Sequence, residues 1–194
     1  MAEFQRLDER EVHRGHIWSV SVARFRGPDD AEFERDIVRS PGSVAVVPIL
    51  FDPEGVASVV LVEQYRPAIE APVIEVPAGM RDVPGEPPSV TAHRELAEEV
   101  GLRAGVLEEL TVIIPSPGMS DATTHIFLAS DCDQVDDSRQ GPEEEAMDVL
   151  HVPLQEALEM VRSGRIADGK SVVGIMLASD RLSRGDLRLC PTPE

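Results

Sequence analysis

One stretch of this chain, from Pro77 to Leu102, constrains its fold more than any other, and it reads PAGMRDVPGEPPSVTAHRELAEEVGL. Two prolines precede a run from Ser89 to Val100 that contains no glycine or proline, and Gly101 follows it. Proline suits the first turn of a helix and glycine suits the position after its last turn. The run therefore predicts a helix, capped near Ser89 or Thr91. Its periodicity places three apolar residues on the buried side, namely Val90, Leu96 and Val100.

Three carboxylates crowd the second half of this predicted helix. Residues three and four apart share a helix face, so Glu95 and Glu99 align and Glu98 lies beside them. Arg94 can pair with Glu98, but one guanidinium does not neutralise three acids. A hard divalent cation with oxygen ligands, such as Mg²⁺ or Mn²⁺, would do so, whereas the alternative is a solvated acidic face. The glycine- and proline-containing turn before the helix favours the metal, because its backbone carbonyls can complete a metal shell.

The stretch resembles the signature of the Nudix hydrolase family, the Nudix box. Glu86, then seven residues, then the run RELAEEVGL from Arg94 to Leu102 match that signature without a gap. Six residues rather than five separate Gly79 from Glu86, but the extra residue falls in the turn and leaves the helix register unchanged. The resemblance extends over roughly residues 43 to 182. It implies an α/β fold, a Nudix-type α/β/α sandwich with a mixed sheet.

Alternating and apolar runs elsewhere predict the remaining elements. An N-terminal β-hairpin is expected from strands at 16–25 and 33–39, with Trp18, Val20 and Val22 on one face and residues 1–10 loose. This hairpin is expected to occupy residues 1–42 and to serve dimerisation, and the Nudix domain residues 43–194. Within that domain we expect strands at 43–51, 58–64, 73–76, 106–114, 123–129 and 147–152, an acidic surface loop at 131–145, and helices at 153–163 and 171–182. Pro48 inside the first of these strands indicates a bulge or a sheet edge.

Composition limits the partners of the chain. With 194 residues and 42% hydrophobic residues it is long enough for a sizeable core, and its net charge of −18 disfavours nucleic acid or an anionic membrane as partner. It contains no apolar run of about 20 residues and no signal-peptide core at its start, so we expect a cytoplasmic protein. Cys132 and Cys190 are then expected to be reduced thiols, with a lone disulfide as the alternative.

The resemblance also implies roles for the residues of the box. Nudix hydrolases cleave a nucleoside diphosphate linked to another moiety, with Mg²⁺ and Mn²⁺ as candidate cofactors. The resemblance makes Glu95 and Glu99 primary metal ligands and Glu98 a further ligand or a base. It adds the backbone carbonyl of Ala78 as a ligand, Arg94 as support for the carboxylates, and Glu86 as a partner of Arg94 or a water-mediated ligand.

Three features outside the box resemble the ADP-ribose pyrophosphatase branch of this family. The segment SPGMSD contains Pro117 and Gly118 at the spacing that the branch shows, although an ordinary turn is the alternative. The segment EQYR ends in Arg66, which would reach substrate phosphates, and the alternative is an exposed strand end. The acidic segment PEEEAMDV would bring in a catalytic glutamate, Glu145 or alternatively Glu144, unless it is only a solvated cluster.

In this branch the N-terminal segment joins a two-fold homodimer. Arg39 would then stack on the adenine and Trp18 or Phe25 would flank it, although Trp18 is equally well explained as buried core. The segment ADGKS also resembles the branch, but it gives Lys170 no chemical role. We therefore expect a homodimeric, Mg²⁺-dependent enzyme that converts ADP-ribose to AMP and ribose 5-phosphate. The alternatives are a nucleotide-sugar pyrophosphatase of the same fold and a ligand sensor without catalysis.

Overall fold

The computed structural model describes residues 3–137, 139 and 144–185 of the chain. It divides into two compact units, which we describe separately. The first consists of Met1–Gly42 together with Ile114–Thr123, and the second of Ser43–Ile113 together with Thr124–Glu194. None of the helices in the described ranges has the length and hydrophobicity of a transmembrane helix.

The second unit is built on a seven-stranded mixed sheet whose central strand is β4 (Ser43–Phe51). The strands follow the order β10-β5-β4-β9-β8, while β6 pairs with β5 and β7 pairs with β4. Up to Pro48, β4 runs parallel to β9, and from Ile49 it runs antiparallel to β5. The bounds of its partners are β5 (Ala57–Arg66), β6 (Ala71–Glu75), β7 (Ala78–Met80), β8 (Leu102–Ile113), β9 (Thr124–Gln134) and β10 (Asp148–Pro153).

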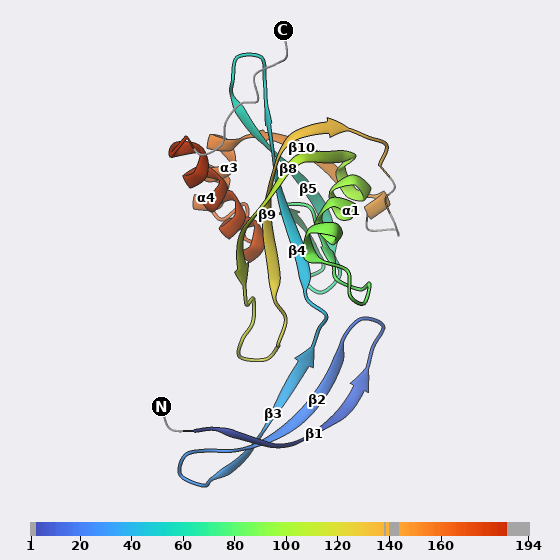
Figure 1. Ribbon diagram of the computed structural model, residues 1–194, viewed down its shortest axis with the longest axis vertical. Coiled ribbons are helices and arrows are strands. Elements are labelled where there is room, and N and C mark those ends of the chain that lie inside the picture. Colours follow the sequence, from blue (N-terminus) through green and yellow to red (C-terminus); the bar gives the residue numbers. More distant parts are fainter. Residues whose placement is uncertain (1–2, 138, 140–143, 186–194) are drawn as a thin grey trace. The chain divides into compact units, whose positions relative to one another are not determined.

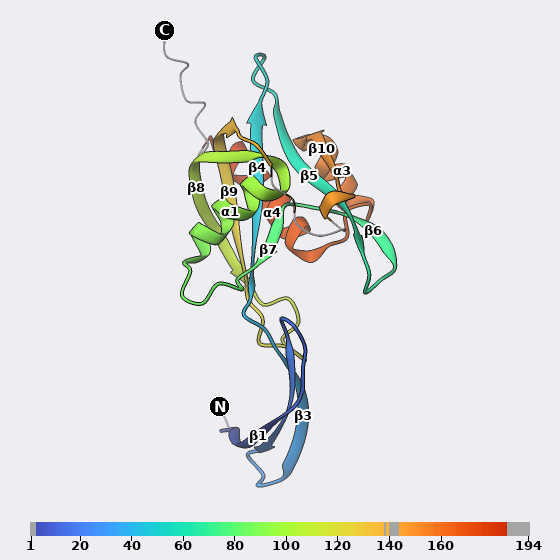
Figure 2. The same ribbon diagram turned by 90° about the vertical axis from the view of Figure 1, so that its right-hand side faces the viewer.

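Helices cover both faces of this sheet. On one face, Leu96 of α1 (Pro88–Val100) packs in a cluster with Val44 and Val46 of β4. On the other, α3 (Leu154–Arg162) and α4 (Gly169–Ser183) pack against the alternate residues Ala45 and Val47. Figure 1 shows the sheet between α1 and the α3–α4 pair, and Figure 2 shows the unit from the side of α1. The predicted α/β/α sandwich is confirmed, and its physical basis is a central strand that is apolar on both faces.

The predicted helix is confirmed, and Gly101 ends it in the left-handed conformation with φ of 63°. The predicted cap is wrong, because Pro87 occupies the N-cap position and no side chain caps the helix. The Thr91 hydroxyl instead donates to Glu86 Oε2 at 2.7 Å. Val90 is also misplaced, since 49% of it is exposed, whereas Leu96 and Val100 are buried as expected.

Other boundaries shift for identifiable reasons. The predicted acidic loop is shorter at its start, because β9 continues to Gln134 in a long antiparallel ladder with β8, which itself begins at Leu102. The end of that loop includes residues 140–143, which lie outside the described residues.

Pro48 does not mark a sheet edge, because β4 is central, and it lies where β4 changes its pairing partner. The short strand β7 was not predicted, and glycine, a weak strand former, is its middle residue. Cys132 is a free thiol, and Cys190 lies outside the described residues.

The first unit contains a three-stranded antiparallel sheet rather than a two-stranded hairpin. Its strands are β1 (Gln5–Arg14), β2 (Ser19–Arg26) and β3 (Glu32–Arg39). The expectation that residues 1–10 are loose is wrong from Gln5 on, because charged residues of β1 pair across the strands, as Asp8 does with Arg24 at 2.6 Å. Within β2, Ser21 and Ala23 are the buried residues, and 54% of the neighbouring Trp18 is exposed.

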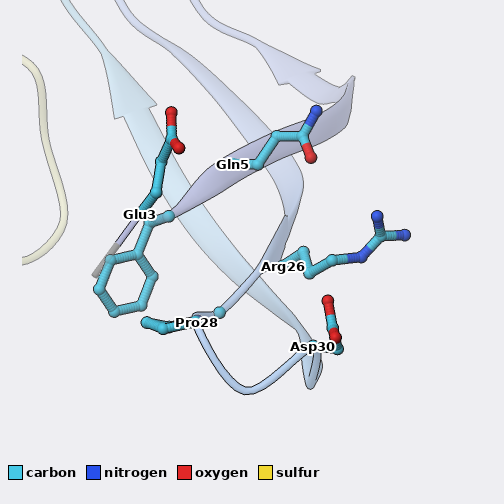
Figure 3. Close-up of a pocket in the computed structure, with 7 residues that line it drawn as sticks. Glu3, Gln5, Arg26, Pro28 and Asp30 are labelled. Carbon is cyan, nitrogen blue, oxygen red and sulfur yellow. The ribbon is translucent and has the colours of Figure 1, made fainter.

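The segment between β8 and β9 completes this unit. The Val38 amide donates to the Met119 carbonyl at 2.8 Å, and Arg39 pairs with Asp121 at 2.9 Å. A hollow of about 580 Å³ opens at one end of the sheet, where Arg26 and Asp30 reach to the same side (Figure 3). Arg26 pairs with Glu32 at 2.9 Å, so its charge is already balanced and we assign no chemistry to this hollow.

Candidate functional site

The candidate site lies in the second unit, where α1 passes beside β7. The backbone amide of Ala78 donates to Glu99 Oε2 at 2.9 Å. Gly79 allows Glu95 to approach the strand, because a Cβ at this position would lie 1.9 Å from the Glu95 carboxyl carbon. Only a residue without a side chain fits there. The glycine of the box thus gives the Glu95 carboxylate its place against the backbone.

The two carboxylates that face β7 are almost completely buried, with 7% of Glu95 and 3% of Glu99 exposed. Burial raises the pKa of Glu99 to about 8, against the opposing hydrogen bond from Ala78. Burial also raises the pKa of Glu95 to about 7, since the attraction of Arg94 offsets it only in part. Both groups therefore require more positive charge than the protein supplies if they are to be ionised together.

Arg94 is the protein's own counter-charge at this site. Its Nη1 lies 2.7 Å from Glu95 Oε1 and 3.2 Å from Glu98 Oε2, which confirms the predicted pairing with Glu98. Its Nη2 lies 3.5 Å from both Glu86 Oε2 and Asp82 Oδ1. One guanidinium is thus shared among four carboxylates and fixes their arrangement.

A cavity of about 250 Å³ opens in front of these carboxylates. Arg66, at the end of β5, contributes a cation to its wall, and Glu144 contributes a further carboxylate. Glu145 is exposed and is not among the residues that line the cavity. The lining consists of Gln64, Arg66, Ala78, Gly79, Met80, Asp82, Arg94, Glu95, Glu98, Glu99 and Glu144.

This set of donors fits a hard divalent cation. Besides Arg66 and Arg94, the charged groups that line the cavity are carboxylates, whose oxygens Mg²⁺ and Mn²⁺ prefer over nitrogen or sulfur as ligands. In the part of the chain that the structure describes, no three Asp, Glu, His or Cys side chains already form a ligand set. These carboxylates are instead bound to other groups of the protein. Arg94 donates hydrogen bonds to Glu95 and Glu98, and the Ala78 amide donates to Glu99. A cation would compete with Arg94 for the Glu95 carboxylate.

The sequence-predicted site residues fall into both units. The second unit brings together Glu86, Arg94 and the residues of the cavity, including Ala78 and Arg66. Arg39, Pro117 and Gly118 belong to the first unit. There Arg39 is held by Glu9 at 2.6 Å and by Asp121 at 2.9 Å. Phe25, which was expected to flank a base, stacks on Phe33 with 5.6 Å between ring centroids.

Sequence reasoning missed the ionic partners of Arg66. Arg66 Nε and Nη2 bind the two carboxylate oxygens of Glu75 at 2.6 and 2.7 Å, and Lys170 pairs with the same carboxylate. One sequence signal was available, because Glu75 ends an otherwise apolar strand, APVIE, and a carboxylate there needs a partner. Another was that Lys170 is the single lysine of the chain.

Comparison with known proteins relates the chain to one family. A model described as the NUDIX domain matches residues 41–171. The ADP-ribose pyrophosphatase of Bacillus subtilis strain 168 is 33% identical over 173 residues, covering 89% of this chain and 91% of that protein. A protein named methanol dehydrogenase activator from Bacillus methanolicus shows the same identity and coverage. The crystal structure of an ADP compounds hydrolase superposes with a TM-score of 0.80 at 22% identity, covering 96% of this chain and 97% of that one.

The burial of Glu99 predicts how Glu99→Gln changes stability. The pKa of Glu99 is raised from 4.5 to about 8 in the folded state. Between these two pH values the folded protein therefore binds more protons than the unfolded chain. Metal-free wild type should therefore lose stability as pH rises from 4.5 to 8, and the variant, in which only Glu95 still has a raised pKa, should lose less. At pH 8 in chelator we expect the variant to be more stable by roughly 1–3 kcal/mol in urea unfolding.

Saturating Mg²⁺ should make the wild type more stable than Glu99→Gln. It stabilises the wild type by binding the folded state, whereas the variant lacks a ligand. Equal stabilisation of both proteins by Mg²⁺ would contradict the assignment of Glu99 as a metal ligand.

Proposed function

This chain belongs to the NUDIX family, and we propose that it hydrolyses ADP-ribose to AMP and ribose 5-phosphate with Mg²⁺ as cofactor and Mn²⁺ as the alternative. One observation carries the proposal. Glu95 and Glu99 are buried beside the Ala78 backbone, and Arg66 contributes a cation to the wall of the same cavity. A diphosphate needs both kinds of group, cations for its oxygens and carboxylates that hold further cations. The Bacillus subtilis relative carries the name ADP-ribose pyrophosphatase, which supports this substrate.

The residues of the candidate site would have separate roles in this reaction. Glu95, Glu99 and the Ala78 carbonyl would hold the metal, with Glu98 as a further ligand. When bound, a divalent ion neutralises diphosphate oxygens and lowers the pKa of the attacking water. Arg94 keeps the carboxylates in place, since its guanidinium already lies 2.7 Å from Glu95. Arg66 binds a phosphate oxygen and thereby orients the substrate.

In the proposed reaction, water attacks one phosphorus of the diphosphate. The new bond joins the water oxygen to that phosphorus, and the bond from the phosphorus to the bridging oxygen breaks. A carboxylate of the acidic segment accepts the proton of the water. Glu144 is the better placed of the two candidates, because it lines the cavity whereas Glu145 is exposed.

A panel of diphosphate compounds tests the function. The purified protein with Mg²⁺ should release AMP from ADP-ribose faster, by kcat/KM, than GMP from GDP-mannose, AMP from NADH or products from diadenosine polyphosphates. Chelator should abolish the reaction. A preference for GDP-mannose would favour the nucleotide-sugar alternative, and binding without any hydrolysis would favour the sensor.

The two glutamates can be separated by a matched pair of variants. Glu144→Gln should lower kcat by about 100-fold or more, because it removes the proton acceptor, while the Kd for ADP-ribose should change little. Glu145→Gln makes the same chemical change at an exposed neighbouring position and should keep kcat within about threefold. Single-turnover kinetics at saturating Mg²⁺ would show this. The opposite order of effects would assign the proton transfer to Glu145.

We also propose that the protein acts as a homodimer through its first unit. The three-stranded sheet buries few side chains within its unit, and Phe4, Val12, Ile17 and Trp18 are exposed. Exposed apolar groups of this number favour association with another protein surface. Light scattering should give twice the chain mass of 21.1 kDa, and Trp18→Glu should shift the protein toward the monomer. A monomeric wild type at micromolar concentration would contradict the dimer.

A further inference from the structure

A second ionic cluster lies next to the carboxylate cavity, and the proposed mechanism uses only its Arg66. Its centre is Glu75, of which 2% is exposed. Arg66 binds both oxygens of this carboxylate, and the Lys170 ammonium pairs with one of them. Lys170 also lies 3.0 Å from Asp168, which accepts a hydrogen bond from the Ser171 amide at 3.0 Å. Three elements, β5, β6 and α4, therefore meet at one buried carboxylate.

The α4 end of this cluster is fixed to the sheet by hydrogen bonds. Asp168 is the N-cap residue of α4, and the Ser171 hydroxyl donates to it at 2.6 Å. The backbone amide of Val76 donates to the Ser171 hydroxyl at 2.9 Å. Ser171 is fully buried, so these bonds are shielded from water. The position of Lys170 is therefore set by the same contacts that dock α4 beside the end of β6.

Lys170 is the only lysine among the 194 residues, in a chain that otherwise uses arginine for its cations. An arginine at this place would present a broad planar fork, whereas an ammonium is a compact charge that donates in several directions. Two separate acceptors, Glu75 and Asp168, suit the ammonium. Sequence and geometry thus single out the same residue.

We propose that Lys170 is a positioning residue, which holds the Glu75 carboxylate and through it the guanidinium of Arg66 at the wall of the carboxylate cavity. The role of Arg66 toward phosphate rests on the proposed function, whereas its anchoring by Glu75 and Lys170 does not. Arg66 lines both the carboxylate cavity and a neighbouring cavity of about 530 Å³ that Glu75, Asp168 and Lys170 also line. It is therefore the member of the cluster that a bound diphosphate meets.

Charge balance assigns Lys170 a holding role at Glu75. The two cations Arg66 and Lys170 face the two carboxylates Glu75 and Asp168, so the cluster is neutral overall. Lys170 therefore acts by fixing the Glu75 carboxylate, and through it Arg66, in place. The bidentate contact fixes the plane of the guanidinium, which leaves its remaining N–H groups in one defined direction.

The first test measures geometry without any activity. In protein labelled with ¹⁵N-arginine, exchange of the Arg66 Nε proton with solvent should be slow in the wild type. Lys170→Met should accelerate this exchange about tenfold or more, because Glu75 loses the partner that fixes it. Arg165→Met is the matched control, since Arg165 lines the same neighbouring cavity and its loss removes the same charge. Unchanged exchange in Lys170→Met would overturn the proposal.

The second test separates positioning from stability. With ADP-ribose, Lys170→Met should raise KM about tenfold with kcat within about threefold, and Arg165→Met should leave both within about twofold. The double variant Glu75→Gln, Lys170→Met removes both charges, so it should recover the Tm of the wild type while KM stays raised. Recovery of KM together with Tm would show a purely structural role and overturn the proposal.

The two hypotheses fail in different ways. If the wild type does not hydrolyse ADP-ribose, the proposed function is wrong and the proton exchange of Arg66 alone decides the positioning role. If Lys170→Met does not fold, Lys170→Gln replaces it in both measurements, because it removes the charge and leaves the Glu75 carboxylate in place. In that case Arg66 exchange as slow as in the wild type would overturn the proposal, and accelerated exchange would support it.

Discussion

The structure of the second unit depends on the burial of two carboxylates against a sheet that cannot neutralise them. Glu95 and Glu99 lose their hydration between α1 and β7, and desolvation of a charge costs several kcal/mol. The surrounding features each offset part of that cost. Arg94 is shared among the acids, the Ala78 amide binds Glu99, and Gly79 gives Glu95 room. The part of the desolvation cost that these features do not offset is the free energy that a bound cation can recover.

The sandwich places opposite charges on neighbouring elements of one face. α1 supplies the acids, and the end of β5 supplies Arg66, which Glu75 holds from β6. The clusters on both sides of β4 are apolar, so these charges gather outside them, where Arg66 and the carboxylates of α1 line one cavity. A diphosphate, which carries negative charge and needs metal, matches this arrangement of cations and acids. The same fold without the carboxylates of α1 would have no such preference.

Much of this could be predicted from the sequence, and particular residues show why. The helix α1 was predictable because its interruption-free run and Gly101 are local signals that tertiary structure did not override. The strand β1 was missed because it is rich in charged residues, and contacts such as that of Asp8 with Arg24 form only when the strands pair. The sequence could not decide between Glu144 and Glu145, because they belong to a run of identical residues in which no pattern shows which side chain faces the site. Glu75 and Lys170 are 95 residues apart, and only the folded chain brings them together.

The segment between β8 and β9 has a consequence for how this chain can change over evolution. Ile114–Thr123 is counted with the N-terminal strands, so the polypeptide passes between the two units three times. Val38 and Arg39 of β3 bind Met119 and Asp121 of that inserted segment. Recombination at a single junction after Gly42 would therefore separate partners that belong together. The N-terminal strands and the distant insertion must be inherited as a pair, and substitutions in one are expected to be compensated in the other.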